Sequence, residues 1–339
     1  MPNQRPEPFR RRPFVIIKPL VILTRIAMVQ VIEERRADLA DESALRVAVF
    51  GLGSMGYGIA SSILRAGHIV HGFDVVPETM ARFKADGGSS GEIAEVAPTL
   101  DAVVVVVLNA DQTEAVLFGE SGIVPQLRSG AVVLSCATVS PEFAREKAAQ
   151  CEARQIRYLD APISGGSVKA AAGQLSIMAS GSKASFDAAA PILDATAEVV
   201  FNMGDEAGAG SVMKVVNQLL AGVHIATMAE AITFGMKQGL APDRFLEVIS
   251  KCAGTSWMLE NRAPHIVDGD YTPHSQVDIW LKDLGIVLDI ARADKFSAPI
   301  AAAALQQYVA ASGMGLGKED DAAVAKVYAR NSGIELPGE

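Results

Sequence analysis

The segment Gly51-Leu52-Gly53-Ser54-Met55-Gly56 has the spacing G-x-G-x-x-G that is typical of a dinucleotide-binding turn. The first glycine permits a tight turn, the second lets the backbone approach a pyrophosphate, and the third allows close packing of helix on strand. A short β-branched run at 46–50 precedes the turn, and a helical pattern from about 54 to 65 follows it. This context favours a phosphate site at a helix N-terminus over a glycine turn that holds no ligand.

Asp74 ends the second predicted strand, about 20 residues after the glycine turn, where an acidic residue hydrogen-bonds the adenosine ribose. Its charge would repel the 2′-phosphate of NADP. Val75 and Val76 follow it, so no arginine is present there to hold that phosphate. The segment therefore predicts NAD as the cofactor.

Lys214 lies in an otherwise apolar helical segment, which is costly for a lysine unless its amine reaches solvent or has a task. Asn217 and Gln218 share its face of the helix. An ammonium beside two amides can exchange a proton with a substrate hydroxyl, and burial would lower its pKa toward the working pH. The pattern alone fits a surface lysine equally well.

Two further segments carry polar groups that could bind a small ligand. Asp160-Ala-Pro-Ile-Ser-Gly-Gly166 offers a hydroxyl and backbone N–H groups, which suit a carboxylate, although a plain glycine turn fits as well. Lys282-Asp283-Leu284 lies in a mixed helix. Taken alone, this charged pair is expected to be part of a solvated helix face.

These residues need elements to position them, and the pattern becomes regular from Leu45 onward. Strands are expected at 46–50, 69–73, 102–108, 131–135 and 156–160, alternating with helices. That alternation predicts an α/β fold with a doubly wound parallel sheet of Rossmann type. Beyond about 202 only helices are expected, near 210–238, 242–251, 276–293, 297–312 and 320–330. We predict an NAD-binding domain at 46–206 and an all-helical substrate and oligomerisation domain at 207–339, joined by the long helix.

Residues 1–45 differ from the rest. Arginines at 5, 10, 11 and 12 precede an apolar run over 14–32, which Lys18, Pro19 and Arg25 interrupt. No stretch of about 18 uncharged apolar residues remains. We expect a poorly ordered extension, with a signal anchor or a transit-like peptide as the alternatives.

Composition excludes several classes of function. The chain has 339 residues and a formal net charge of −9, which argues against a general nucleic-acid surface. Three cysteines, not paired as metal ligands, indicate reduced thiols in a cytoplasmic protein. With five scattered histidines, no metal site is expected, and neither is a membrane partner.

The four motifs occur in one order with consistent spacing, and the chain resembles the β-hydroxyacid dehydrogenase family over about residues 46–330. This family includes 3-hydroxyisobutyrate dehydrogenase and tartronate semialdehyde reductase. The resemblance implies a homo-oligomer, dimer or tetramer, that acts on a small hydroxy acid in a cleft between its two domains. It also implies roles for single residues: Lys214 as general acid/base, Ser164, Gly165 and Gly166 on the substrate carboxylate, Leu108, Asn109 and Thr138 on the cofactor, and Lys282 reaching both cofactor and substrate.

One position departs from the family. Many relatives have Asn four residues after the lysine, where this chain has Gln218, with Asn217 one residue earlier. We expect the longer amide of Gln218 to make the same contact as the Asn of those relatives.

Several polar segments resemble the L-threonate dehydrogenase branch of the family, and such segments have little reason to recur as core packing. They lie at 217–225, 256–258, 260–262, 268–275, 277–279 and 317–321. This branch would oxidise L-threonate with NAD to 2-dehydro-L-erythronate. Trp257, His274 or Asp278 would then line the pocket for the distal hydroxyls.

Three alternatives stay open. The first is the same chemistry on 3-hydroxyisobutyrate, or as a tartronate semialdehyde (2-hydroxy-3-oxopropionate) reductase. The second is an NADPH imine reductase, although such enzymes usually lack the lysine and carry an arginine near the end of the second strand. The third is a dinucleotide-binding regulator without activity, which the intact motifs disfavour.

Overall fold

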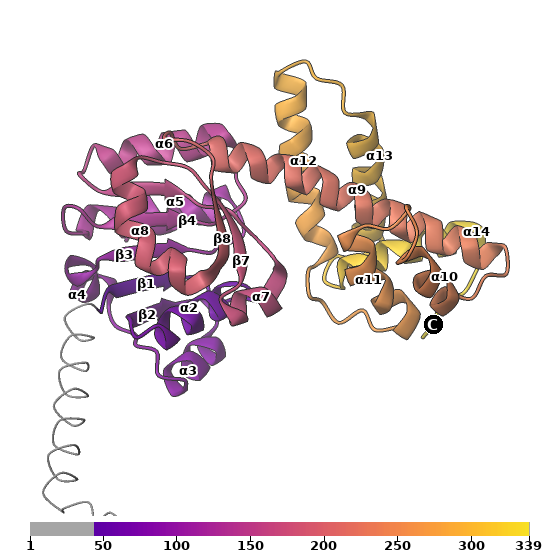
Figure 1. Ribbon diagram of the computed structural model, residues 1–339, viewed down its shortest axis with the longest axis horizontal. Coiled ribbons are helices and arrows are strands. Elements are labelled where there is room, and N and C mark those ends of the chain that lie inside the picture. Colours follow the sequence, from indigo (N-terminus) through magenta and orange to yellow (C-terminus); the bar gives the residue numbers. More distant parts are fainter. Residues whose placement is uncertain (1–43, 339) are drawn as a thin grey trace, which may run out of the picture. The chain divides into compact units, whose positions relative to one another are not determined.

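The computed structural model describes residues 44–338, so most of the expected extension lies outside the described residues. A five-stranded sheet forms the first part, in the order β2-β1-β3-β4-β5, and every neighbouring pair is parallel (Figure 1). Its strands are β1 (Arg46–Phe50), β2 (Ile69–Phe73), β3 (Ala102–Val105), β4 (Val132–Ser135) and β5 (Arg157–Asp160). The predicted parallel α/β sheet is therefore confirmed. Strand β3 is shorter than expected, because Val106 to Leu108 leave the sheet and lie partly or fully exposed.

Helices cover both faces of this sheet, which explains its continuous apolar strands. Val47, Val49 and Val104 pack in one core, and Ala48, Phe50 and Val103 pack in the other. The first face is covered by α2 (Gly56–Arg65), α3 (Pro77–Ala85), α7 (Gly166–Ala172) and α8 (Lys183–Thr196). The second is covered by α4 (Ile93–Val96), α5 (Ala110–Phe118) and α6 (Pro141–Glu152), with short 3₁₀ turns at Ala97–Thr99 and Val124–Gln126.

A second, three-stranded sheet follows that the sequence patterns did not predict. It consists of β6 (Ile163–Ser164), β7 (Leu175–Ala179) and β8 (Ala197–Asn202), with β6 antiparallel to β7. Strand β6 has two residues and β8 is mostly exposed, so neither carries a clear apolar signal. This sheet holds the segment that contains Ser164.

Helices alone make up the described chain beyond Asn202, as predicted. They are α9 (Ala209–Lys237), α10 (Pro242–Ile249), α11 (Trp257–Asp268), α12 (Val277–Ala293), α13 (Pro299–Ala311) and α14 (Ala325–Ser332). A π-helical turn (η3, Ser312–Leu316) follows α13, and a 3₁₀ turn (η4, Asp321–Val324) precedes α14. The predicted segment 320–330 is therefore two elements. Helix α11 was missed, because Pro264 and a run of polar residues obscure its pattern; Ser256 caps it by accepting from Leu259 N.

Helix α9 is long and apolar enough, by length and composition, to cross a membrane. In the structure it packs against every other α-helix of this part of the chain. Ile225, Met228 and Ile232 are buried in the core that these helices share. The buried face of α9 is thus explained by its place as the core helix of the helical part, whereas Val212, Met213, Val216 and Leu220 on the same helix are exposed.

Buried polar contacts join three elements around α9. Arg262 of α11 donates to Asp321 of η4 at 2.5 Å, and Trp280 Nε1 of α12 donates to the other oxygen of Asp321 at 2.9 Å. Asp320 accepts from His274 N at 2.9 Å. Arg262, His274, Asp320 and Asp321 belong to the polar segments that resemble the L-threonate dehydrogenase branch. Those segments were not expected to take part in core packing. That interpretation is wrong for Arg262 and Asp321, because both are buried and hold the helices together.

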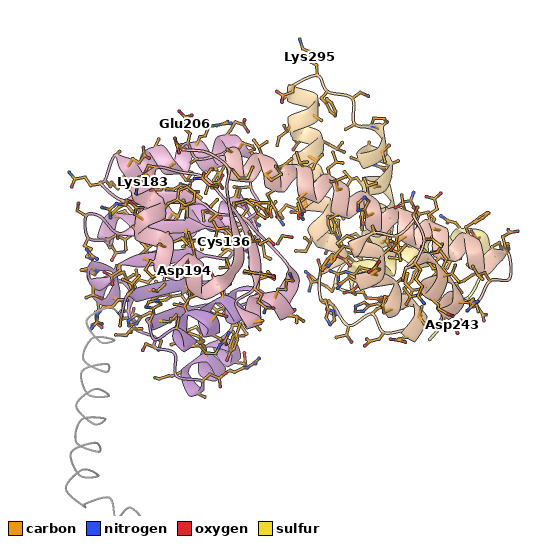
Figure 2. The ribbon with its side chains drawn as sticks, viewed as in Figure 1. Cys136, Lys183, Asp194, Glu206, Asp243 and Lys295 are labelled. Carbon is orange, nitrogen blue, oxygen red and sulfur yellow. The ribbon has the colours of Figure 1, made fainter. Side chains whose placement is uncertain are left out.

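The three cysteines are free thiols. Cys136 lies inside the first part, whereas Lys183 projects from the surface of that part and Asp243 and Lys295 project from the helical part (Figure 2). Burial raises the pKa of Cys136 and of Cys151 to about 12, so neither is a reactive thiolate at neutral pH.

Candidate active site

The glycine turn between β1 and α2 has the geometry that a dinucleotide needs. Gly51 has a φ of +86°, and a Cβ there would lie 2.6 Å from Val106 O. A Cβ on Gly56 would lie 1.8 Å from Gly51 O, so the helix packs too closely for any side chain. Nothing lies within 4 Å of a Cβ built on Gly53. The space over Gly53 is open, as a pyrophosphate contact requires.

Free N–H groups surround that open space. The backbone N–H groups of Gly53, Ser54, Met55 and Gly56 donate to no other residue in the described part of the chain. Leu52 differs, because its N–H donates to Asp74 Oδ2 at 2.6 Å. Four N–H groups at the start of α2 thus fit an anionic pyrophosphate, while Leu52 ties the turn to Asp74.

Asp74 sits where the ribose is expected. Its Oδ1 accepts from Val76 N at 2.9 Å, so backbone groups fix both carboxylate oxygens. Each oxygen has a second lone pair that can accept from a ribose hydroxyl. Val75 is 96% exposed and offers no charge to a phosphate. The site residues therefore fit NAD.

The charge of Asp74 predicts how cofactor choice can be changed. We expect the double variant Asp74→Ser/Val75→Arg to lower the ratio of kcat/KM with NAD to that with NADP by about tenfold or more. Like charges about 4 Å apart repel by ~1 kcal/mol in water and by ~4 kcal/mol near a protein surface. Steady-state rates with both cofactors measure this ratio. Asp187→Ser, which removes an exposed carboxylate on α8, is the control and should leave the ratio unchanged.

The remaining predicted cofactor residues lie after β3 and β4. Leu108 is exposed. Asn109 caps α5, because its Oδ1 accepts from Gln112 N at 2.8 Å, so its side chain already has a structural task. Thr138 lies after β4, and its carbonyl accepts from Lys282 Nζ at 3.3 Å. Lys282 thus reaches from α12 to the carboxyl end of the sheet.

Lys214 is 9% exposed and its Nζ donates to Ile163 O at 2.8 Å. Burial lowers the pKa of Lys214 to about 8, with Asp283 acting to raise it and Lys282 to lower it further. An amine with this pKa is present in both protonation states near neutral pH. Such an amine is suited to general acid/base work.

Asp160, at the end of β5, anchors the helix that carries Lys214. Its Oδ2 accepts from Gly208 N at 2.9 Å and Ser211 N at 2.8 Å, and its Oδ1 accepts from Ser211 Oγ at 2.8 Å. Gly210 allows the close approach, since a Cβ there would lie 2.3 Å from Met178 O. Sequence reasoning did not find this role, because the partners lie 48 and 51 residues apart.

The predicted carboxylate loop is brought beside Lys214. Ser164 directly follows Ile163, whose carbonyl accepts from Lys214, and Gly165 and Gly166 follow with φ values of +134° and +76°. Nothing lies within 4 Å of a Cβ built on Gly166. The segment that carries the Ser164 hydroxyl and the N–H groups of Gly165 and Gly166 thus begins directly after the residue that accepts from the lysine amine.

The pair Lys282–Asp283 is not a solvated helix face, as the pattern alone suggested. The side chain of Asp283 is 3% exposed and that of Lys282 is 25% exposed, with Nζ 2.6 Å from Asp283 Oδ1. Asp283 Oδ2 accepts from Gln218 Nε2 at 2.5 Å. Folding brings α12 against α9 here, so the pair belongs to the surroundings of Lys214.

The residues expected to contact distal hydroxyls are engaged elsewhere or exposed. Asp278 accepts from Ser312 Oγ at 2.7 Å, and His274 stacks edge-on against His265 with ring centres 4.8 Å apart. Trp257 is exposed. No contact among the described residues links these three to Lys214.

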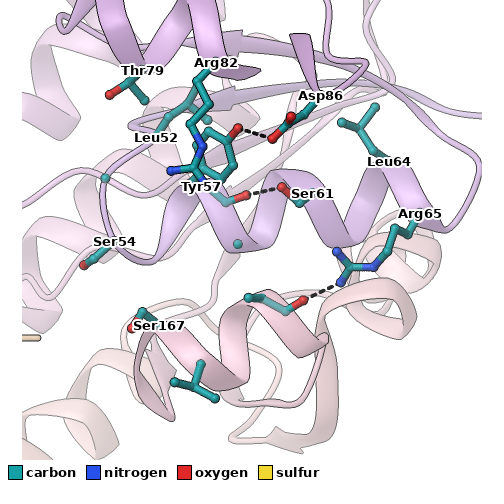
Figure 3. Close-up of a pocket in the computed structure, with 14 residues that line it drawn as sticks. Leu52, Ser54, Tyr57, Ser61, Leu64, Arg65, Thr79, Arg82, Asp86 and Ser167 are labelled. Carbon is teal, nitrogen blue, oxygen red and sulfur yellow. Dashed lines mark hydrogen bonds between the residues drawn. The ribbon is translucent and has the colours of Figure 1, made fainter. Parts of the chain in front are cut away.

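A separate pocket of about 880 Å³ lies between α2, α3 and α7 (Figure 3). Ser54 and Ser167 line it, and Arg82 stacks on the ring of Tyr57 at 4.3 Å. Tyr57 donates to Asp86 at 2.6 Å. The pocket borders the glycine turn but does not include Lys214. Within residues 44–338, no group of three or more His, Cys, Asp and Glu could hold a metal ion.

Comparison with known proteins agrees with this geometry. A family profile described as the NAD-binding domain of 6-phosphogluconate dehydrogenase matches residues 46–204, and one described as the NAD-binding part of NADP-dependent 3-hydroxyisobutyrate dehydrogenase matches residues 208–328. The L-threonate dehydrogenase of Cupriavidus necator is 48% identical over 86% of this chain and 98% of its own length. The chain belongs to the β-hydroxyacid dehydrogenase family. It is therefore an NAD-dependent oxidoreductase whose substrate is a small-molecule hydroxy acid.

Solved structures of β-hydroxyacid dehydrogenases show the same fold. The structure of a 3-hydroxyisobutyrate dehydrogenase from Salmonella typhimurium has a TM-score of 0.80 and 47% identity, covering 84% of this chain and 99% of that one. An imine reductase from Pseudomonas sp. has a TM-score of 0.56 at 20% identity, a likeness that concerns the fold alone. The named dehydrogenase relatives favour neither an imine reductase nor a regulator without activity.

Proposed function

We propose that this enzyme oxidises L-threonate at C2 to 2-dehydro-L-erythronate, with NAD as the hydride acceptor. The likeness to L-threonate dehydrogenase over 98% of that protein's length is the observation that carries the proposal. The buried Lys214 beside the Ser164 loop supports it with a site of suitable chemistry.

In the proposed reaction, Ser164 Oγ and the N–H groups of Gly165 and Gly166 hold the substrate carboxylate. Neutral Lys214, oriented by Ile163 O, accepts the proton of the C2 hydroxyl as the carbonyl forms. Bound NAD supplies the acceptor for the hydride that leaves C2. In the reverse direction the Lys214 ammonium returns the proton to the carbonyl oxygen.

The other predicted residues position these partners. The glycine turn (Gly51, Leu52, Gly53, Ser54, Met55, Gly56) and Asp74 hold the pyrophosphate and ribose. Leu108, Asn109 and Thr138 border the cofactor, and Lys282 lies between cofactor and substrate. Of the two amides predicted to bind the substrate, Asn217 contacts the acid and Gln218 supports Asn217. In this proposal residues 46–206 form the cofactor domain, and 207–339 form the substrate and oligomerisation domain.

A second candidate substrate is 3-hydroxyisobutyrate, because the similar Salmonella typhimurium protein is named a 3-hydroxyisobutyrate dehydrogenase. NADH formation with purified enzyme and a panel of acids separates the two. The panel contains L-threonate, D-threonate, D-erythronate, D-glycerate and 3-hydroxyisobutyrate. The proposal requires the highest kcat/KM with L-threonate; a higher value with any other acid rejects it.

The pKa of Lys214 predicts the pH dependence of the reaction. Oxidation needs the neutral amine, so kcat/KM is expected to rise with pH and to level off above about 8. The reverse reduction needs the ammonium and should fall above the same pH. Lys282→Met removes a cation that lowers this pKa, so its profile should shift to higher pH. A wild-type profile flat between about pH 6 and 9 would contradict the assignment.

We also propose that the enzyme is a cytoplasmic homo-oligomer, dimer or tetramer. Phe296 (67% exposed), which follows α12, and Ile300 (66% exposed), at the start of α13, support the oligomer as exposed apolar side chains. Light scattering of the wild type should give a multiple of the chain mass, and Phe296→Ser/Ile300→Ser should lower it. The control Leu240→Ser, at another exposed apolar residue, should not. A monomeric wild type would refute this part of the proposal.

A further inference from the structure

One ion pair and two hydrogen bonds form a line of polar contacts from α12 into α9 beside Lys214. Lys282 Nζ lies 2.6 Å from Asp283 Oδ1, and Asp283 Oδ2 accepts from Gln218 Nε2 at 2.5 Å. Gln218 Oε1 in turn accepts from Asn217 Nδ2 at 2.9 Å. Asp283 and Gln218 are buried, and Asn217 is partly exposed.

The Asp283 carboxylate fixes the orientation of the Gln218 and Asn217 amides. An ionised carboxylate only accepts hydrogen bonds, so the Gln218 amide must present its NH₂ to Asp283. Its oxygen then faces Asn217, which must present its own NH₂. A reversed Gln218 amide would place two oxygens together at Asp283 and two NH₂ groups together at Asn217, and would leave buried groups unpaired. Lys282 forms an ion pair with the other oxygen of Asp283, which accepts no hydrogen bond within the described residues.

Two consequences follow for the substrate site. The amide oxygen and nitrogen of Gln218 are both engaged within the protein, unlike the substrate-binding amide expected at this position. The oxygen of Asn217 has no partner anywhere in the part of the chain that the structure describes. Asn217 lies three residues after Lys214, on neighbouring parts of one helix face.

We infer that Asp283 is a positioning residue that acts through Gln218, and that Asn217 contacts the substrate. Asn217 Oδ1 accepts a hydrogen bond from a hydroxyl of the acid other than the one that is oxidised. The site thereby selects polyhydroxy acids over acids with a single hydroxyl. This inference rests on the proposed function for the position of the acid.

The first test compares L-threonate with 2-hydroxybutyrate of the same C2 configuration, which lacks the further hydroxyls. Asn217→Leu should lower kcat/KM for L-threonate by about 5- to 15-fold, the usual effect of one neutral hydrogen bond. The value for 2-hydroxybutyrate, or its inhibition constant where turnover is too slow, should stay unchanged. Equal losses for both acids would overturn the role of Asn217.

The second test addresses Asp283. Asp283→Asn no longer fixes the orientation of the Gln218 amide, so it should lower the ratio of kcat/KM for L-threonate to that for 2-hydroxybutyrate. Gln218→Met should lower the same ratio. The double variant should lose no more preference than Asp283→Asn alone, because both act on the same line. Additive losses would overturn the positioning role. Asp289→Asn, at an exposed carboxylate on the same helix, is the matched control and should change nothing.

A failure of the proposed function is distinguishable from a failure of this inference. If the wild type oxidises D-glycerate but not L-threonate, the proposed substrate is wrong. The same variants are then compared on D-glycerate and its deoxy analogue D-lactate. A lower preference for D-glycerate over D-lactate in these variants supports the inference, and an unchanged preference overturns it.

Discussion

Replacing Lys214 by alanine is expected to lower kcat for hydroxy-acid oxidation by about 10²–10⁴-fold, with NAD affinity unchanged. Lys214 Nζ donates to Ile163 O, directly before Ser164, and burial lowers the pKa of Lys214 to about 8. Without this amine, the hydroxyl proton must leave to water while the hydride departs. Steady-state kinetics and NAD titration followed by protein fluorescence measure the two quantities.

Two controls separate this effect from a general loss of structure. Lys183→Ala removes an exposed lysine on α8, and it should retain full activity. Added methylamine should restore part of the activity of Lys214→Ala by entering the space of the side chain. Retention of more than about a tenth of wild-type turnover would show that Lys214 is not the general base.

Replacing Arg262 by methionine is expected to destabilise the protein by about 3–5 kcal/mol, because it leaves a buried carboxylate without its partner. Arg262 donates to Asp321 at 2.5 Å, and both side chains are buried between α11 and η4. The change should appear as a lower urea midpoint by circular dichroism.

The loss of stability in Arg262→Met should be larger at high pH than at low pH. Burial raises the pKa of Asp321 to about 6 despite the lowering effect of Arg262, so the attraction exists mainly above that pH. The destabilisation should therefore be larger at about pH 8 than at about pH 5. Arg244→Met, which breaks an exposed pair with Glu247 on α10, should cost about 1 kcal/mol or less. A similarly small loss for Arg262→Met would mean that the buried pair does not stabilise the helices.

The parallel sheet was predictable because both of its faces are buried. Alternate residues of β1 and β3 enter opposite cores, so each strand is a short continuous apolar run, and such a run is recognisable in the sequence without any alternation. Strand β8 has mainly exposed residues, and α11 contains a proline and several charges. Their positions depend on neighbours distant in the chain, which local patterns do not record.

The same distinction applies to the site. Lys214 stood out because a lysine in an apolar helix needs a local explanation. The pair Gln218–Asp283 joins residues 65 positions apart, so its partners became visible only after α9 and α12 had packed. Arg262 and Asp321 show the reverse case: they lie in polar segments that were not expected to be core packing, and both proved to be buried structural partners.

The central claim is that the enzyme removes hydride from C2 of L-threonate and transfers it to NAD. The most direct test uses L-threonate that carries deuterium at C2, with mass spectrometry of the reduced cofactor and of the acid product. We predict deuterated NADH and 2-dehydro-L-erythronate in equal amounts. Unlabelled NADH, or a product oxidised at another carbon, would contradict the claim.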